Sequence, residues 1–342
     1  MLVIIALCLF WSFSSCFAVL DLSTLSTTKG YKFYNPVSND ALFGFSQSCE
    51  SDINGDGRKD VAIGAPTLSS LNMNRNGAAF VLFAPAISPS SDIPVDLRQG
   101  NFNLSFGSAN YGPDPGSKYG FSTDFSGDID GDGVLDKIIG QPLPSRTTAD
   151  VNMAGNVFVH SLSSVFSLYG TKTHGRVGHA VAVLGDLNQD RRSDFAVGMP
   201  GADSATYGTD CGMVYVFYGS PVLHTTIIGS NASAGFRVMG KQADHHFGYS
   251  IAALGDMNGD GIPDFVIGSN STVGSANPHA AVIYGKSDFT DINLASMTTN
   301  QGCLILGAYG GRIIVAKAGD VNKDGIVDML IGMPDAVVDG VS

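Results

Sequence analysis

Short apolar runs bounded by glycine and proline are the recurring hydrophobic pattern of this 342-residue chain. The runs are rich in β-branched and aromatic residues, which is typical of β-strands. No stretch shows the 3.6-residue periodicity of an amphipathic helix. The pattern therefore predicts an all-β fold, and its clearest strands lie at 77–83, 155–160, 212–218 and 280–284.

A nine-residue acidic loop recurs five times along the chain, with starts 76, 58, 70 and 64 residues apart. An aromatic–glycine pair or its relic precedes four copies, at Phe43-Gly44, Tyr119-Gly120, Val177-Gly178 and Phe247-Gly248. Apolar-biased positions and a glycine follow every copy. A period of roughly 65 residues with four strands per unit is typical of a propeller blade. The loops occupy 52–60, 128–136, 186–194, 256–264 and 320–328.

Each loop places oxygen-bearing side chains at its positions 1, 3, 5 and 9, and the backbone carbonyl of position 7 can join them. Hard, mostly anionic oxygens suit Ca²⁺. Position 6 is glycine in four loops, where a sharp turn with positive φ is expected. Position 2 is always apolar and is expected to anchor the loop on a core. The predicted ligands are Asp52, Asn54, Asp56, Arg58, Asp60; Asp128, Asp130, Asp132, Val134, Asp136; Asp186, Asn188, Asp190, Arg192, Asp194; Asp256, Asn258, Asp260, Ile262, Asp264; and Asp320, Asn322, Asp324, Ile326, Asp328.

These loops differ from EF-hands at position 12. An EF-hand needs a bidentate glutamate there and a helix behind it. This chain has isoleucine or valine at that position, followed by a predicted strand. The alternative is that Asp-Asn-Gly clusters are simply good turns, and five concordant copies favour calcium. The third loop fits least well, because Arg191 replaces the glycine and Arg192 adds a second positive charge.

The formal net charge of −12 bears on both partners and metal. Nucleic acid is not an expected partner, because phosphate binding needs a basic face. The five loops hold sixteen of the 31 acidic residues, so five bound Ca²⁺ would bring the charge close to −2. A structural role for up to five ions is therefore expected, in which the metal neutralises and locks each loop.

The N-terminal residues 1–18 carry no charge and predict a secretory signal peptide, which leaves 19–342 as the propeller; an uncleaved membrane anchor is the alternative. No later stretch is long and apolar enough to span a bilayer. Three cysteines remain in the mature chain and allow at most one internal disulfide: Cys49, Cys211 and Cys303. Three triplets are expected to accept N-linked glycans, at Asn103, Asn231 and Asn270.

The common catalytic motifs are missing from the sequence, so we do not expect an enzyme. There is no G-x-S-x-G, no H-E-x-x-H and no phosphate-cradling loop. Serines follow three of the aromatic–glycine pairs, at Ser46, Ser122 and Ser250, but no histidine or aspartate stands at a repeated offset to activate them. They are expected to face a neighbouring blade. The pair His245-His246 is expected to lie in a solvated loop.

Phe-Gly, then D-x-[DN]-x-D-G-x-x-D, then Gly64-Ala65-Pro66, is a combination that resembles the FG-GAP repeats of integrin α chains. The resemblance covers the chain from about residue 40 onward. It implies a seven-bladed propeller of four-stranded blades, about five of them in this chain, with calcium loops on one face and partner-binding loops on the other. The segment 19–22 resembles the strand that closes the ring. Because the sequence stops midway through its fifth repeat, the propeller is expected to be incomplete.

The same resemblance implies an extracellular module, secreted or at the cell surface, for cell adhesion or ligand recognition. Its expected partners are an extracellular protein or glycan ligand and an integrin β-like subunit. Two alternatives stay open. One is an accessory propeller of a secreted hydrolase, as in glycosylphosphatidylinositol-specific phospholipase D, and the other is a propeller lectin.

Overall fold

The computed structural model describes residues 33–34, 42–48, 51–69, 75–83, 93–94, 107–143, 154–162, 164–170, 175–222, 225–228, 235–271, 279–307 and 311–335. All regular structure in these residues is β-strand, which confirms the all-β prediction. No helix that could cross a membrane occurs in this part of the chain. The predicted signal peptide, Cys49, Asn103 and Asn231 lie outside the described residues.

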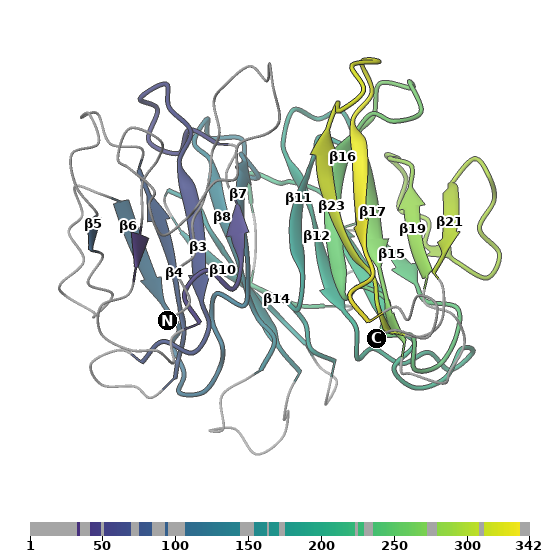
Figure 1. Ribbon diagram of the computed structural model, residues 1–342, viewed down its shortest axis with the longest axis horizontal. Coiled ribbons are helices and arrows are strands. Elements are labelled where there is room, and N and C mark those ends of the chain that lie inside the picture. The colour runs from purple at the N-terminus through teal and green to yellow at the C-terminus, as the bar shows by residue number, and fades with distance from the viewer. Residues whose placement is uncertain are drawn as a thin grey trace, which may run out of the picture.

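Four antiparallel sheets follow one another along the chain as propeller blades, and a β-hairpin begins a fifth (Figure 1). Within each blade the strand order follows the chain order. Blade 1 contains β2 (Gln47–Ser48), β3 (Val61–Ala65), β4 (Ala78–Leu82) and β6 (Gly107–Tyr111). Blade 2 contains β7 (Ser122–Gly127), β8 (Asp136–Gln141), β9 (Asn156–His160) and β10 (Val165–Tyr169).

The later blades repeat this plan. Blade 3 contains β11 (Val181–Gly185), β12 (Asp194–Met199), β13 (Met213–Phe217) and β15 (Gly235–Met239). Blade 4 contains β16 (Ser250–Gly255), β17 (Asp264–Gly268), β19 (His279–Ile283) and β21 (Gly302–Leu306). The hairpin of blade 5 contains β23 (Ile314–Gly319) and β24 (Asp328–Gly332), and β18 (Asn270–Ser271) pairs with β22 (Gly311–Arg312) to join it to blade 4.

Short strands from the connections add a parallel strand to the preceding blade. β14 (Thr226–Ile227) follows β13 and pairs with β10, and β20 (Ile292–Asn293) follows β19 and pairs with β15. β5 (Ile93–Pro94) follows β4 and pairs in the same parallel way with β1 (Phe33–Tyr34). β1 therefore takes the place of the outermost strand of a blade preceding blade 1. The predicted closing strand at 19–22 itself lies outside the described residues.

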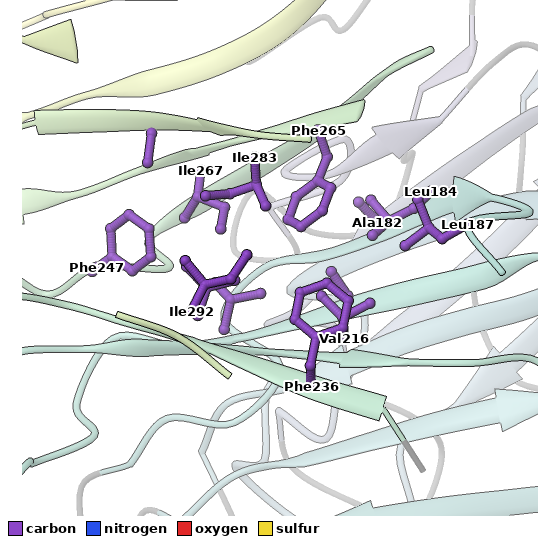
Figure 2. Close-up of a cluster of buried hydrophobic side chains, with 14 of the residues drawn as sticks. Ala182, Leu184, Leu187, Val216, Phe236, Phe247, Phe265, Ile267, Ile283 and Ile292 are labelled. Carbon is purple, nitrogen blue, oxygen red and sulfur yellow. The ribbon is translucent and has the colours of Figure 1, made fainter. Parts of the chain in front are cut away.

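The hydrophobic core lies between the blades, because alternate residues of a strand point to opposite faces of a sheet. In β12, Phe195 and Val197 pack toward blade 2, whereas Ala196 packs toward blade 4. The cluster between blades 3 and 4 joins Phe236 of blade 3 to Phe265 and Ile283 of blade 4 (Figure 2). Each blade therefore contributes two apolar faces, and each core needs two blades.

Neighbouring blades approach closely at the glycine that follows each of the first four acidic loops. A Cβ on Gly140 of β8 would lie 2.1 Å from the carbonyl oxygen of Gly178, the glycine that opens blade 3. The Ser122 hydroxyl donates to the same carbonyl at 2.8 Å. Ser46 and Ser250 donate in the same way to the carbonyls of Gly120 and Ile313 in the following blades, at 3.0 and 2.9 Å. The structure thus confirms that the three serines face neighbouring blades.

The innermost strands line a central channel, and Asp124 of β7 ties three of them together. One carboxylate oxygen accepts hydrogen bonds from Ser48 of blade 1, at 3.2 Å, and from Ser126 of its own blade, at 2.8 Å. The other accepts the backbone N–H of Val183 in blade 3, at 2.8 Å. Burial raises the pKa of Asp124, while these hydrogen bonds favour its ionised form.

Candidate functional site

The five acidic loops are hairpin connections, each joining the innermost strand of a blade to its second strand. They therefore all lie at the same end of the innermost strands. Their position-2 side chains anchor them unevenly: Ile129 and Leu187 are fully buried, but Val321 is 71% exposed. The predicted hairpin placement is confirmed, and the predicted apolar anchor is strongest in the second and third loops.

The position-1 aspartate organises each loop by accepting backbone N–H groups. In the first loop, Asp52 accepts the N–H of Gly55, Asp56 and Gly57 at 2.8, 3.0 and 2.6 Å. The fourth loop repeats the three bonds through Asp256, at 2.7, 3.1 and 2.8 Å. Because one carboxylate accepts several backbone N–H groups, these hydrogen bonds fix the loop around its oxygen atoms.

The aspartate at position 9 ends each loop. It is almost wholly buried in the first four loops, as Asp60, Asp136, Asp194 and Asp264. Each accepts the backbone N–H of the position-2 residue at 2.7 or 2.8 Å. Burial raises the pKa of Asp136 to about 7, and the nearby carboxylates of Asp130 and Asp132 add to the rise. Burial likewise raises the pKa of Asp194 to about 7. In the described residues, no ion pair links Asp136 or Asp194 to a positive side chain.

The second loop brings three carboxylates together. One oxygen from each of Asp128, Asp130 and Asp136 lies within 4.8 Å of the others. In blades 3 and 4 the second oxygen of the position-9 aspartate accepts an N–H from Gly219 or Gly285, at 2.7 and 2.9 Å. The same Oδ1 of Asp136 is buried and has no hydrogen-bond partner in the described part of the chain. Clustered carboxylates and an orphaned oxygen are a donor set that fits a hard divalent cation.

Two positions of every loop need a left-handed backbone. Position 6 has positive φ in all five loops, which confirms the prediction for the four glycines and extends it to Arg191, at 69°. Position 4 also has positive φ, and the sequence pattern did not reveal it because Gln189 and Lys323 stand beside three glycines there. The third loop therefore keeps the shared backbone shape despite its different residues.

The donor set of the third loop differs from the others in one respect. Arg192 Nη1 lies 3.2 Å from Asp190 Oδ2, so a guanidinium is paired with the carboxylate at position 5. The backbone of Arg192 still donates to the other oxygen of Asp190, at 2.9 Å, as Arg58 does to Asp56 in the first loop. The first, second, fourth and fifth loops fit calcium by their donors, whereas the third already holds a cation of its own.

The opposite ends of the innermost strands carry an aromatic arc, which we define as Phe45, Phe121, His179 and Tyr249. Each follows the glycine that opens its blade, so the arc lies away from the acidic loops. Successive ring centroids are 4.6, 4.9 and 4.4 Å apart. Phe45 is 50% exposed, and the other three rings are half-buried. No sequence pattern predicted this arc, although its members share one repeat position.

Burial keeps the histidine of the arc neutral. It lowers the pKa of His179 to about 4, and Arg176 and Lys118 nearby oppose a further positive charge. His179 Nδ1 lies 3.1 Å from the Tyr249 carbonyl oxygen, which requires Nδ1 to be the protonated nitrogen. The arc therefore presents four uncharged rings in a row.

His245 departs from its predicted place in a solvated loop. It is 1% exposed, and its Nδ1 lies 3.0 Å from Nδ1 of the fully buried His279. His279 also stacks on Phe247, with ring centroids 5.6 Å apart. The prediction was wrong because the covering residue comes 34 positions later, from β19. His246 alone is half-buried at the surface.

The remaining predicted sites are only partly described. Cys211 is buried and Cys303 is exposed. Asn270 lies half-buried in β18, opposite Arg312, and its glycosylation stays a prediction. The nucleophile-like serines are engaged between blades, as described above.

Comparison with known proteins places these features in a family context. The model of the FG-GAP repeat matches residues 247–284, which include Phe247-Gly248 and the fourth loop. Integrin alpha-11 of Homo sapiens is 30% identical over 216 residues, covering 59% of this chain and 17% of the relative. Integrin alpha-PS2 of Drosophila melanogaster is 28% identical over 268 residues, covering 72% and 17%.

Integrin alpha-5 of Xenopus laevis is similar over a shorter stretch, with 29% identity over 203 residues, 53% of this chain and 18% of the relative. The chain thus spans less than a fifth of the length of the curated relatives that it matches. The matched repeat, the blades and these similarities agree with one another. The chain is an FG-GAP repeat protein that resembles the N-terminal β-propeller of integrin α chains.

Proposed function

We propose that this chain is an extracellular, calcium-stabilised propeller that recognises a protein partner in cell adhesion, as an integrin α chain would. The observation that carries the proposal is the division between the two ends of the innermost strands. One end holds preorganised oxygen loops, and the other holds the aromatic arc. It acts by binding and carries out no catalysis.

Calcium suits the loops for electrostatic reasons. Each loop crowds three or four carboxylates into nine residues. Like charges at such spacing repel, and burial of the position-9 aspartate removes the water that would screen them. A bound Ca²⁺ supplies the missing positive charge to the side-chain oxygens and the position-7 carbonyl. The ion would therefore act on stability and hold the hairpin that binds it in place.

The aromatic arc supplies the recognition side of the proposal. Its neutral rings expose faces that attract a cationic or apolar side chain. Phe45, which precedes the innermost strand of blade 1, is the most exposed ring of the arc, at 50%. We propose that an integrin β-like subunit or another extracellular protein seats a side chain on this arc.

Thermal unfolding in about 1 mM Ca²⁺ and then in excess chelator tests the calcium half of the proposal. A site of about 10⁻⁴ M contributes roughly 1.4 kcal/mol at that concentration, so several sites should raise the midpoint by about 10 °C or more. Asp256→Asn, which weakens one loop, should lose only a fraction of the rise. Equal midpoints in both solutions, with the protein folded, would mean that the loops are only turns.

Co-expression with an integrin β subunit tests the recognition half. The pair should co-purify from the medium, and Phe121→Ser should abolish co-purification because it removes the ring between Phe45 and His179. The matched control is Leu162→Ser, an exposed leucine outside the arc, which should leave it intact. Failure of wild type to co-purify would exclude the integrin-like pairing, whatever the calcium result.

A further inference from the structure

The third acidic loop already contains a positive charge where its relatives in the chain have none. Arg192 Nη1 is paired with Asp190 Oδ2 at 3.2 Å, and the two side chains are only 30% and 31% exposed. In the first loop Arg58 stands at the same position, yet no ion pair links it to Asp56 in the described part of the chain. An arginine at position 7 is therefore not sufficient for this pairing.

The surroundings of Arg192 explain why its side chain folds inward. A Cβ on Gly131 of the second loop would lie 3.1 Å from Arg192 Nε, whereas the equivalent Gly55 and Gly259 have nothing within 4 Å. The next residue, Ser193, donates its N–H to the carbonyl of Asp128 at 2.7 Å. Arg192 therefore packs against the second loop. Its Nε is buried without a hydrogen-bond partner in the described residues.

The guanidinium is added to a contact that the other loops also make. In the first, third, fourth and fifth loops, Oδ2 of the position-5 aspartate accepts the neutral amide of the position-3 asparagine, at 3.2, 3.2, 2.8 and 2.9 Å. Among the described loops, only the third adds an arginine side chain to the same oxygen. That amide can rotate to present its oxygen to an ion. A guanidinium has no acceptor atom and keeps its charge at every working pH. Calcium would have to displace it, or bind beside it against repulsion.

We propose that Arg192 takes the place of calcium in the third loop, so that the chain binds four ions, in the first, second, fourth and fifth loops. The proposal rests on the proposed calcium function of those loops. Extracellular calcium sites work at about 10⁻⁴–10⁻³ M, so a tenfold loss of affinity leaves a site at most about half filled at 1 mM. The third loop then links blades 2 and 3 without a metal ion.

Counting bound ions by native mass spectrometry and by equilibrium dialysis, in about 1 mM free Ca²⁺, tests the proposal. Wild type should hold four ions per chain. Arg192→Ile, which copies Ile262 of the fourth loop, should hold a fifth with at least tenfold higher affinity for the third loop. The matched control Arg58→Ile should stay at four. Far-UV circular dichroism in calcium confirms that each variant is folded.

Single-ligand variants assign the ions to loops. Asp190→Asn should leave the count at four, whereas Asp260→Asn at the equivalent position of the fourth loop should lower it to three. Five ions in wild type, with each variant removing one, would overturn the role of Arg192 while leaving the calcium function standing. A count of four in Arg192→Ile would also overturn it. No bound ion in wild type would instead refute the calcium function itself.

Discussion

The two ends of each innermost strand are held by different contacts. Those at one end join residues close in sequence, and those at the other end join residues far apart in sequence. At the loop end, almost every hydrogen bond joins residues within one nine-residue segment, such as Asp256 to Gly261. At the other end, the bonds cross between blades, and Ser122 reaches Gly178 over 56 positions. The loop end can therefore form within a single hairpin, whereas the other end exists only when two blades are docked.

The largest effect should follow from breaking the interblade end at Gly140. An alanine Cβ there would lie 2.1 Å from the carbonyl oxygen of Gly178 and 2.2 Å from Ser122 Oγ. Because backbone cannot move aside without separating the blades, we expect Gly140→Ala to cost about 3 kcal/mol or more of unfolding free energy. Urea unfolding monitored by circular dichroism measures the loss.

The matched control lies at the loop end. Gly259 has positive φ, at 79°, but a Cβ added there would meet no atom within 4 Å. Gly259→Ala should therefore cost only the backbone strain of about 1–2 kcal/mol. A Gly140→Ala protein as stable as Gly259→Ala would show that the blades can shift apart freely, and would remove the contrast between the two ends.

The same contrast explains what could be predicted from the sequence. The loops, their hairpin placement and the left-handed turn at Gly57 depend on neighbours within a few residues, so a repeated motif reveals them. The glycines that precede and follow the loops recur as motifs in the sequence. The contact that brings two of them together, Gly140 and Gly178, cannot be seen there.

Contacts between distant segments could not be read from a pattern. His245 is buried by His279, and the aromatic arc has an aromatic or imidazole ring from each of four blades at one repeat position. The arc also varies in residue type, with a histidine among phenylalanine and tyrosine, which hides it from a motif search. The sequence shows only an excess of positive charge at Arg192. The pair with Asp190 depends on the contact of Arg192 with Gly131 of the preceding blade, which no local pattern reveals.

Acid should weaken the interblade end through the buried pair His245 and His279. Burial lowers the pKa of His279 to about 3, and that of His245 in the same direction, so the fold favours their neutral forms. Their stabilisation is complete above the unfolded pKa of about 6.5 and is lost as the pH falls below it. Each histidine should lose up to about 1.4 kcal/mol per pH unit, measured as unfolding free energy at pH 7 and 5 in saturating calcium.

His279→Gln should reduce the pH dependence of the unfolding free energy by the contribution of His279, because the unfolded state can no longer take up a proton at this position. The control Ser269→Ala removes the hydroxyl that bonds the backbone of His279, at 2.7 and 2.9 Å, without removing a titrating group. It should lower stability equally at both pH values. If His279→Gln keeps the wild-type slope, the acid sensitivity arises elsewhere.

The smallest effect tests whether the interblade end depends on its hydroxyls or on its glycines. Ser122→Ala deletes the 2.8 Å hydrogen bond to the Gly178 carbonyl and should cost about 1 kcal/mol. The chain contains its own precedent, because blade 3 has Ala180 at this position, and its Cβ would lie 3.3 Å from a Cβ on Gly198. Blade 3 nevertheless docks on blade 4 through the largest buried cluster of the described residues (Figure 2). The converse variant Ala180→Ser should therefore change the free energy of unfolding by less than about 1 kcal/mol. If Ser122→Ala cost as much as Gly140→Ala, the hydroxyl rather than close backbone approach would hold the blades together.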